Sequence, residues 1–270
     1  METGDTKKNR FQLQAKIVDI TCADGICKIV IEAPEICEAS SAGQFVMVKT
    51  SEGNSNDPLF RRPFSIHRIS DGLLTIVFKV VGRGTKNLAN MRKSQLLDVV
   101  GPLGKGFILT DHARYYLVGG GMGIAPMYYL AENLRREKTK SQIFVMMGGQ
   151  TLKEIEVFQD ITELPGVTLR MATNDGSFGH HGLVTDLMEQ TAVEHGDGAV
   201  YCCGPLPMMK AVALFCKDKN FDCQVSLETT MACGVGACLG CVVKGSGTIG
   251  EGYLHVCKDG PVFAAGQIWT

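Results

Sequence analysis

Four cysteines near the C-terminus have the residue type and spacing for iron–sulfur chemistry. They stand in the pattern C-x4-C-x2-C-x15-C, at Cys233, Cys238, Cys241 and Cys257. Four thiolates can hold one [2Fe–2S] cluster, and a gap of four residues followed by a gap of two is the plant-type ferredoxin spacing. Glycines at 234, 236 and 240 let the backbone curl round such a core. The pattern predicts a one-electron centre, and hence an electron carrier rather than a hydrolase.

Zinc is the main alternative ligand for these cysteines. It also accepts four thiolates, but structural zinc sites usually pair two short knuckles that stand far apart. In this chain three cysteines lie within nine residues and only Cys257 stands apart. An iron–sulfur cluster is therefore favoured, and a zinc site or unligated core cysteines remain as alternatives.

The glycine-rich segment Gly119–Pro126 follows an apolar run and opens a helical pattern. Glycines let a backbone approach a pyrophosphate, and a helix N-terminus presents unpaired N–H groups to it. The segment lacks the G-x-G-x-x-G spacing with an acid about 20 residues further on, so a tight packing turn stays open as an alternative. The candidate nucleotide-binding residues here are Gly120, Gly121, Gly123 and Pro126.

A second turn, Cys203-Gly204-Pro205, ends a later apolar run and precedes another helical pattern. In an open α/β sheet, ligands bind outside the carboxyl ends of the strands. We therefore expect this turn and the glycine-rich segment to lie on the same edge of one sheet. Taken alone, the turn is equally well explained as a plain strand-to-helix connection.

Two segments of the N-terminal half offer groups that suit phosphate. Arg61-Arg62-Pro63-Phe64-Ser65 carries planar guanidinium donors, an aromatic face and a hydroxyl. Gly82-Arg83-Gly84-Thr85 offers backbone N–H groups. An Arg-Pro step at a barrel turn is often only structural. These segments therefore indicate a phosphate site mainly in combination with the other motifs.

The N-terminal elements that would hold these residues look all-β. Short apolar runs recur from residue 11 to 111, and Asp71-Gly72 is a strong hairpin signal. The expected strands are Gln14–Asp19, Cys27–Glu32, Gln44–Lys49, Phe64–Ile69 and Leu73–Val81, with a helical turn at Asn87–Met91. Strands at this spacing predict a small antiparallel β-barrel.

From residue 112 to 227 the pattern changes to alternating strands and helices. The expected strands are Arg114–Gly119, Gln142–Met147, Val167–Ala172, Ala199–Cys203 and Cys223–Leu227, and the expected helices are Ile124–Lys138, Leu152–Gln159, Leu183–Gln190 and Met208–Lys217. Such alternation implies a Rossmann-like parallel sheet with helices on both faces. Residues 228–270 would form the cluster-binding segment, and residues 1–10 a flexible tail.

The bulk properties fit a soluble, cytoplasmic globular protein. The 270 residues suggest about two domains with a small appendage, and the net charge of −1 argues against a nucleic-acid partner. The longest uncharged stretch, Tyr115–Ala131, is too short and too rich in glycine for a membrane span, and no signal peptide is evident. The 11 cysteines, an odd and scattered set, predict reduced thiols rather than disulfides. We expect the six histidines to be exposed or packed rather than catalytic.

Together these motifs resemble the ferredoxin–NADP reductase superfamily. The C-terminal cysteine loop is similar to that of the electron-transfer subunits of NAD-dependent (class 1B) dihydroorotate dehydrogenases, as are three further segments. Those segments are Thr173–Ser177, Gly182–Asp186 and Ser226–Glu228, the last running into Met231-Ala232-Cys233-Gly234. The resemblance covers residues 12 to 265 and implies an FAD-binding barrel, an NAD domain and a [2Fe–2S] segment.

The resemblance also implies residue roles. Arg62 would hold the FAD pyrophosphate, and Ser65 would bond near the reactive N5 of the flavin. Phe64 would lie by the flavin; relatives often have Tyr there, and Phe keeps the ring face while it lacks one possible ribityl contact. The FAD-binding set would be Arg62, Pro63, Phe64, Ser65, Val77, Phe78, Lys79, Gly84 and Thr85, and the NAD-binding set would add Cys203, Gly204 and Pro205 to the glycines. Cys203 would lie near flavin and nicotinamide.

The implied function is an electron relay in pyrimidine (UMP) biosynthesis. A separate FMN-containing catalytic subunit would oxidise dihydroorotate, in a heterotetramer with two of each chain, and electrons would pass through [2Fe–2S] and FAD to NAD+. No side chain need act as acid or base. NAD is favoured over NADP because no Arg follows the second strand of the sheet at Gly149-Gln150-Thr151, although Lys153 could serve a phosphate.

Three other functions remain open. An oxygenase reductase carries the same cofactors, but its last cysteine normally stands much farther along the chain. The small subunit of a bifurcating NAD(P)H–ferredoxin or sulfide reductase would have nearly the same architecture. A zinc-bearing interaction protein on a reductase-like scaffold would lack iron and flavin.

Overall fold

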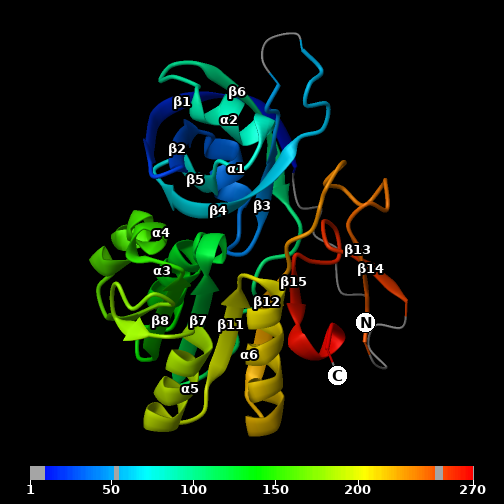
Figure 1. Ribbon diagram of the computed structural model, residues 1–270. Helices are drawn as coiled ribbons and strands as arrows, with labels where there is room; N and C mark the ends of the chain where they lie inside the picture. Colours follow the sequence, from blue (N-terminus) through cyan, green and yellow to red (C-terminus); the bar gives the residue numbers. More distant parts are fainter. Residues whose placement is uncertain (1–9, 52–54, 247–251, 270) are drawn as a thin grey trace.

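The computed structural model describes residues 10–51, 55–246 and 252–269. Six antiparallel strands close a barrel in the order β1-β2-β5-β4-β3-β6 (Figure 1). The strands are β1 (Phe11–Ala23), β2 (Ile26–Glu32), β3 (Phe45–Val48), β4 (Arg62–Ser70), β5 (Leu73–Lys79) and β6 (Leu96–Leu103). The barrel is confirmed, while the tail expected over residues 1–10 lies, apart from Arg10, outside the described residues.

Two elements of this barrel region were not expected, and one is displaced. Strand β6 contains Asp98, Gly101 and Pro102, residue types that are depleted in strands, so its sequence does not look like one. Helix α1 (Pro34–Ala39) has only six residues. Helix α2 (Arg83–Ala89) begins before the turn expected at 87–91, within the Gly82–Thr85 motif, and Gly82 is its N-cap.

One cysteine prediction is wrong. Cys22 and Cys27 form a disulfide across the β1–β2 hairpin, whereas all seven cysteines outside the cluster pattern were expected to be reduced. The reason is the register of the hairpin: the turn at Asp24-Gly25 places Cys22 directly opposite Cys27. Scattered spacing along a sequence does not reveal such pairing. The other five, Cys37, Cys202, Cys203, Cys216 and Cys223, are free thiols.

The second half of the chain forms a seven-stranded sheet in the order β10-β9-β8-β7-β11-β12-β15. Its parallel strands are β7 (Arg114–Gly120), β8 (Gln142–Gly149), β9 (Val167–Thr173), β10 (His180–His181), β11 (Ala199–Cys203) and β12 (Asp222–Ser226). The expected parallel sheet is confirmed. The added edge strand β15 (Val262–Ala264) runs antiparallel to β12 and comes from the C-terminal segment.

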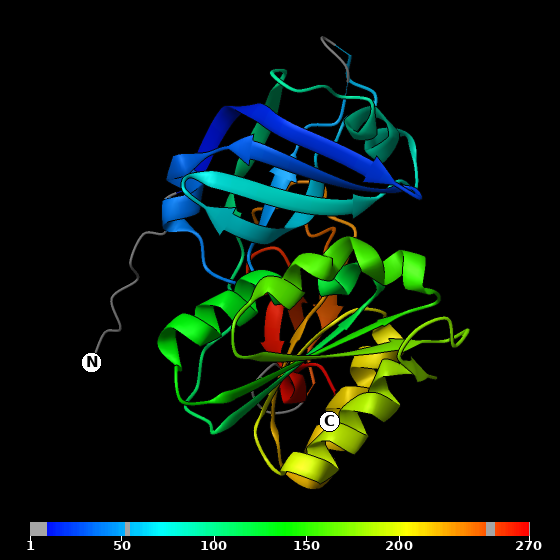
Figure 2. The same ribbon diagram turned by 90° about the vertical axis from the view of Figure 1, so that its left-hand side faces the viewer.

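Helices cover both faces of this sheet, as expected. On β7, Tyr115 and Leu117 pack in the same core as helix α3 (Met127–Glu137), while Tyr116 and Val118 pack with α5 (Val184–His195) and α6 (Leu206–Lys219). Such alternation follows from the twofold side-chain period of a strand. A short turn η1 (Gly121–Ile124) precedes α3, and α4 (Leu152–Ile155) runs into η2 (Glu156–Glu163). Figure 2 shows α3 between the sheet and the barrel.

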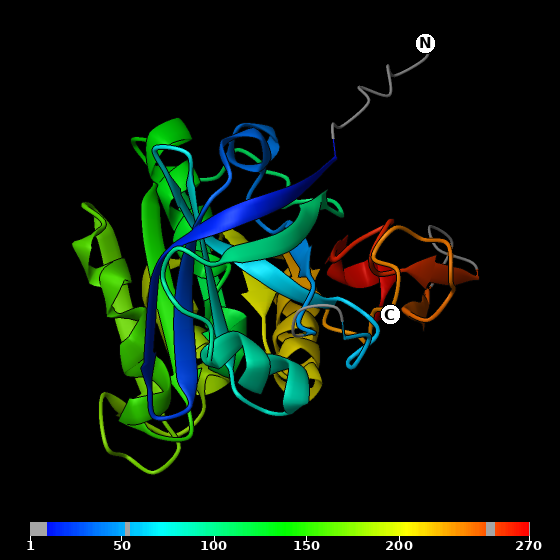
Figure 3. The ribbon, with the colours of Figure 1, turned by 90° about the horizontal axis from the view of Figure 1, so that it is seen from above.

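The C-terminal segment carries a two-stranded sheet of β13 (Val242–Lys244) and β14 (Tyr253–His255), and ends in the turn η3 (Ala265–Gln267). Figure 3 shows this segment, orange to red, on one side of the molecule, with α3 and α4, in green, on the other. Within the described ranges, no helix has the length and apolar character needed to cross a membrane.

Candidate functional site

A cavity of about 620 Å³ opens between the barrel, the loop after β7 and the segment after β12. All nine residues predicted to bind FAD line it: Arg62, Pro63, Phe64, Ser65, Val77, Phe78, Lys79, Gly84 and Thr85. They meet because β4 and β5 are antiparallel neighbours, so the start of β4 and the end of β5 lie at the same end of the barrel. Helix α2 follows β5 directly and completes this wall.

Aromatic and polar groups share the cavity wall. The rings of Phe64 and Phe78 lie 5.5 Å apart between centroids. Arg62 donates from Nη1 to the carbonyl of Phe60 at 2.8 Å, which fixes its guanidinium at the entrance of β4. The hydroxyl of Thr229 is buried in this wall and has no hydrogen-bond partner among the described residues. Aromatic faces, a guanidinium and an unpaired hydroxyl suit a planar aromatic group that carries a pyrophosphate.

Lys79 has a partner that the sequence did not indicate. Its ammonium lies 2.8 Å from Oε1 of Glu154 on α4, while Oε2 of Glu154 accepts the N–H of Gln150 at 2.9 Å. The hydrogen bond from Lys79 and that from Gln150 lower the pKa of Glu154. Glu154 therefore links the cavity wall of the barrel to the turn that follows β8.

The glycines after β7 serve packing more than ligand approach. A Cβ on Gly123 would meet the carbonyl oxygen of Cys203 at 2.3 Å, and one on Gly120 would meet Sδ of Met208 at 2.4 Å. Gly121 differs: it has φ +54° and open space where a Cβ would stand. The neighbouring Met122 and Ala125, which were not predicted, line the cavity. Pro126 stands at the N-cap of α3.

The Cys203-Gly204-Pro205 turn packs directly on this glycine-rich segment. Cys203 pairs with Gly119 in the parallel register of β11 and β7, and a Cβ on Gly204 would lie 3.0 Å from backbone atoms of Gly120. The structure thus brings the two predicted motifs together at the carboxyl edge of the sheet. Neither Cys203 nor its two neighbours lines the cavity, and complete burial raises the pKa of the Cys203 thiol far above its usual range.

The far wall of the cavity comes from residues that the predicted site left out. They are Ser226, Leu227, Glu228, Thr229, Met231 and Pro261. Enclosure by the surrounding chain raises the pKa of the Glu228 carboxyl. The sequence did contain an indication of this wall. Ser226 ends β12, and open sheets bind ligands at the carboxyl ends of their parallel strands.

The cysteine loop folds so that backbone N–H groups point at sulfur. Cys233 Sγ accepts from the N–H of Val235 at 3.4 Å and of Ala237 at 3.3 Å, and Cys257 Sγ accepts from Gly236 at 3.0 Å. The N–H of Cys257 donates to Cys241 Sγ at 3.5 Å. Donors around sulfur stabilise the negative charge of thiolates and cluster sulfide.

The four thiols lie as two neighbouring pairs, Cys233 with Cys238 and Cys257 with Cys241. A zinc ion needs all four sulfurs at about 2.3 Å, whereas each iron of a [2Fe–2S] cluster takes two cysteines. The donor set therefore fits the cluster better than zinc.

Neighbouring groups also shift the pKa values of these thiols. Burial raises the pKa of the Cys233 thiol, but the N–H groups of Val235, Cys238 and Ala237 and the Cys238 thiol lower it more, to about 6. Burial and the hydrogen bond with Cys241 raise the pKa of Cys257 to about 12. The pKa of the thiol is thus lowered at Cys233 and raised at Cys257, on opposite edges of the loop.

The cavity and the cysteine loop are neighbours along the chain. Met231 lines the cavity, and Cys233 follows two residues later, which spans at most about 7 Å of backbone. The loop also rests on the barrel, because a Cβ on Gly234 would touch Met47 at 2.6 Å. A group in the cavity and a cluster on the cysteines would therefore be held close to each other.

Comparison with known proteins agrees with this geometry. Residues 228–269 match the iron-sulfur cluster binding domain of dihydroorotate dehydrogenase B, and residues 117–214 match an oxidoreductase NAD-binding domain. The solved structure of an NADH-dependent reduced ferredoxin-NADP oxidoreductase, studied for flavin-based electron bifurcation, superposes with a TM-score of 0.81 at 30% identity and covers 95% of this chain and 90% of that one. A ferredoxin NADP+ reductase from Neisseria gonorrhoeae, with bound FAD and NADP, shares the fold at 17% identity and a TM-score of 0.62, over 78% of this chain and 91% of that one.

Curated relatives show the family. The chain is 40% identical over 253 residues to a protein of Geobacillus kaustophilus, across 91% of this chain and 93% of the relative. It is 36% identical over 266 residues to one of Fusobacterium nucleatum, across 94% and 98%. Both relatives are named dihydroorotate dehydrogenase B (NAD(+)), electron transfer subunit. The chain therefore belongs to the family of electron transfer subunits of dihydroorotate dehydrogenase B (NAD(+)).

Proposed function

We propose that this chain carries electrons from an FMN-containing catalytic subunit, which oxidises dihydroorotate, to NAD+ in pyrimidine biosynthesis. The observation that carries the proposal is the adjacency of the cavity at Met231 and the cysteine loop at Cys233. When bound, the cluster exchanges single electrons, FAD exchanges one or two, and NAD+ takes up a hydride. The protein's part is to hold these groups close together and to shield them from water.

The proposed roles follow the cavity wall. Arg62 and the start of α2 at Gly84-Thr85 would bind the FAD pyrophosphate, because they supply the positive charge and polar groups of the wall. Phe64 and Phe78 would lie against the flavin ring, with Ser65 beside it. Residues 11–111 would form the FAD-binding part, residues 112–227 the NAD-binding part and residues 228–270 the cluster-binding part.

The NAD site is proposed at the carboxyl edge of the sheet. The Cys203–Pro205 turn packs on Gly120 and Gly123, while Gly121 has open space where a Cβ would stand. The Glu154 carboxylate, paired with Lys79, holds the turn after β8, and Lys153 lies 3.9 Å from Asp24; the turn contains no arginine. Such a turn favours NAD over NADP, whose 2′-phosphate an Arg commonly receives.

The partner subunit is proposed to dock over the cysteine loop. Cys238 is exposed, and its neighbours include Leu239, 61% exposed, and Val235, 39% exposed. Exposed apolar side chains beside a redox centre suit a partner that must approach closely and exclude water. A heterotetramer with two of each chain, in the cytoplasm, is the assembly we propose.

Co-purification tests this assignment. The tagged chain is expressed with its genomic neighbours under anaerobic conditions, and whatever binds it is identified together with its flavin. Recovery of an FMN-bearing chain, and dihydroorotate-dependent reduction of NAD+ by the pair, is the expected result. A colourless, iron-free chain would contradict the proposal.

The small subunit of a bifurcating reductase is the second candidate. It is favoured by the similarity to the ferredoxin-NADP oxidoreductase structure, which extends over 95% of this chain. The same purification decides between the two functions. A partner that reduces ferredoxin, without activity toward dihydroorotate, would support this second function.

A further inference from the structure

The Cys22–Cys27 disulfide stands at the turn of the β1–β2 hairpin. Cys22 is exposed, whereas Cys27 is completely buried in the barrel core. Thiol–disulfide exchange begins with the attack of a thiolate on one sulfur, and its rate depends on access to that sulfur. A small thiol in solution can therefore reach this bond at its Cys22 end, and Cys27 is then the leaving group.

The buried half of the disulfide lies beside a wall of the cavity. In the ladder of β2 and β5, Cys27 stands directly opposite Phe78, which lines the cavity. Side chains directly opposite each other in an antiparallel pair lie on the same face, with Cβ atoms about 4.5–5.5 Å apart. Cys27 and Phe78 accordingly belong to the same core. One side chain separates the disulfide from the cavity.

The turn of the hairpin also holds the end of β5. Ile26 is paired with Lys79, the last residue of β5, and the carbonyl of Gly25 accepts the N–H of Val80 at 2.8 Å. Every residue from 77 to 85 except Val80 lines the cavity. This segment includes the start of α2 that is proposed to bind the FAD pyrophosphate. The hairpin turn therefore anchors a large part of the cavity wall.

The end of β1 has little other support. Residues 11–16 of β1 pair with β6, and residues 16–23 pair with β2. Cys22 thus lies in the part of β1 whose ladder, among the described residues, is with β2 alone. Strand ends with few neighbours open at low cost in free energy. The disulfide is the covalent link that keeps this end of β1 on β2.

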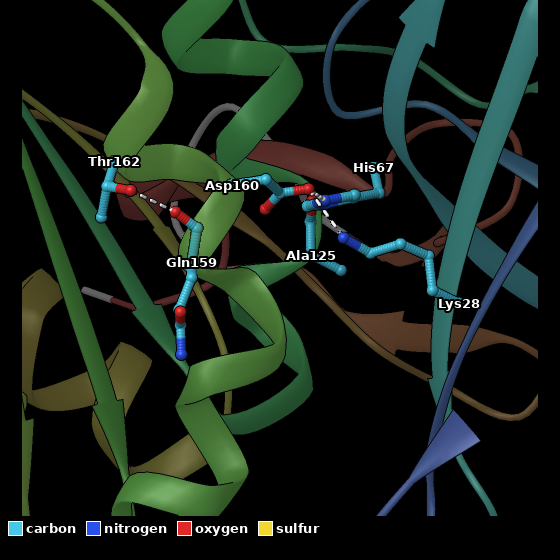
Figure 4. Close-up of polar contacts among 6 residues, drawn as sticks. All are labelled: Lys28, His67, Ala125, Gln159, Asp160 and Thr162. Carbon is cyan, nitrogen blue, oxygen red and sulfur yellow. Dashed lines mark hydrogen bonds and ion pairs between the residues drawn. The ribbon is translucent and has the colours of Figure 1, made fainter. Parts of the chain in front are cut away.

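Two ion pairs connect the same hairpin with the other half of the chain. Figure 4 shows Lys28, which follows Cys27, with its ammonium 2.7 Å from Oδ2 of Asp160. Asp24, in the turn itself, is 52% exposed and lies 3.9 Å from Lys153. Exposed pairs contribute little to stability. Opening of the disulfide therefore frees the turn, while Lys28 still holds β2.

We propose that the Cys22–Cys27 disulfide is an exchange site for low-molecular-weight thiols, and that its opening loosens residues 77–85 and weakens the hold of the cavity on FAD. Disulfides in cytoplasmic proteins are usually transient and serve catalysis or redox sensing. The inference rests on the proposed FAD-binding role of the cavity and on the proposed cytoplasmic location. It adds a control by thiols to the proposed electron relay.

The exchange consumes two small thiols. The first, as a thiolate, attacks the sulfur of Cys22; the Cys22–Cys27 bond breaks, and the sulfur of Cys27 leaves and takes up a proton. The second attacks the small-molecule sulfur of the resulting mixed disulfide and releases Cys22 as a thiol. Two electrons thus pass to the protein, and the two small thiols are oxidised to one disulfide. The reverse sequence closes the bond again.

Two variants of the FAD- and cluster-loaded chain test the proposal. Cys22→Ser changes only the exposed end and leaves Cys27 in the core as a thiol, so it imitates the opened form. Cys37→Ala is the matched control, because it removes a buried free cysteine of α1, between β2 and β3, and keeps the disulfide.

Three measurements are made on each chain after anaerobic equilibration with mixtures of reduced and oxidised glutathione. Alkylation followed by peptide mapping gives the fraction of thiol at Cys22 and Cys27. Flavin fluorescence after dilution gives the rate at which FAD dissociates. Hydrogen exchange gives the protection of residues 77–85 relative to α6 in the same molecule.

The expected results separate the chains. In wild type and Cys37→Ala, FAD dissociates faster and residues 77–85 lose protection as the thiol fraction at Cys22 and Cys27 rises. We expect an increase of about tenfold, which corresponds to about 1.4 kcal/mol and is only a part of what a disulfide typically contributes. Cys22→Ser shows the fast dissociation at every glutathione ratio.

Contrary results are equally clear. A bond that stays closed in folded wild type at every ratio, or that opens without any change in FAD dissociation, would overturn the proposal. Slow dissociation from Cys22→Ser would do the same, as would a response of Cys22→Ser to glutathione as large as that of wild type. If Cys22→Ser fails to fold, the wild-type titration decides. If wild type and Cys37→Ala retain no FAD, the proposed role of the cavity fails, and the protection of residues 77–85 alone judges the disulfide.

Discussion

At the scale of single residues, glycine is required at positions 121 and 123 after β7 for two different physical reasons. Gly123 is required because the backbone of Cys203 lies where its Cβ would stand, at 2.3 Å. Gly121 meets nothing there and is required only by its φ of +54°. A ligand can therefore approach the backbone at Gly121 but not at Gly123. Adding one methyl group to each therefore separates packing from ligand approach.

We expect Gly123→Ala to lower the free energy of unfolding by about 3 kcal/mol, because two backbones must move apart. Gly121→Ala should lower it by only about 1 kcal/mol, the cost of a left-handed alanine. Gly121→Ala should instead weaken NADH binding, because its methyl group fills the open space. Urea unfolding and NADH titration measure both effects. Equal unfolding free energies of the two variants would show that the Cys203 contact is not rigid.

The exposed cysteine of the loop gives a second prediction. Cys238→Ser should remove the iron and sulfide signals but keep FAD, because Cys238 does not line the cavity. Iron analysis and the visible spectrum measure the two cofactors in one sample. Cys223→Ser is a matched control that also replaces one free cysteine and should keep both. Loss of FAD from Cys238→Ser would show that the two sites depend on each other.

At the scale of elements, the barrel and the α4–η2 segment meet through opposite charges. Lys28 and His67 on the barrel face Asp160, and Lys79 faces Glu154. Asp160 is the most enclosed carboxylate of these pairs, with a side chain 15% exposed. Its charge should therefore contribute to stability more than surface pairs do.

Asp160 predicts loss of stability in acid. Its pKa is lowered from 3.8 to about 2 in the folded chain. The stabilisation is complete above about pH 4, and it disappears as the pH falls through about 2, because the unfolded chain takes up the proton first. The shift corresponds to about 2 kcal/mol. The difference in unfolding free energy between wild type and Asp160→Asn should shrink over this range, and a constant difference would contradict the assignment. Any cluster loss in acid is common to both chains.

At the scale of the whole molecule, the barrel, the sheet and the C-terminal segment that leads into the cysteine loop surround one cavity. The cavity lies between the barrel and the sheet and is enclosed on its third side by the C-terminal segment. This arrangement fits the electron transfer subunits to whose family the chain belongs.

We expect the purified single chain to be inactive with dihydroorotate and to pass electrons from NADH to an artificial acceptor such as ferricyanide. Both activities are measured spectrophotometrically on the same FAD-loaded sample. Oxidation of dihydroorotate by the chain alone would contradict this prediction.

Much of the architecture could be predicted from local patterns. Period-two apolar runs gave β1 to β5, and strand–helix alternation gave the parallel sheet. Strand β6 was missed because Asp98, Gly101 and Pro102 hide its pattern, and its place between β3 and β1 depends on partners far away in the sequence. Edge strand β15 was missed for a similar reason, since only its contact with β12 makes three residues a strand.

The sequence by itself determined the chemistry: it showed four cysteines spaced for one cluster, and motifs for flavin and nucleotide in a fixed order. It could do so because the spacing of thiols and the order of motifs are read directly along the chain. Only the tertiary structure decided how these parts face one another. It placed residues 226–229 and Met231 in the cavity wall, paired Cys22 with Cys27, and set His67 against Ala125 and Asp160 in the connections that follow β7 and β8. Contacts between residues far apart in the sequence, such as His67 with Asp160, which are 93 positions apart, are created by the folded chain and leave no local pattern.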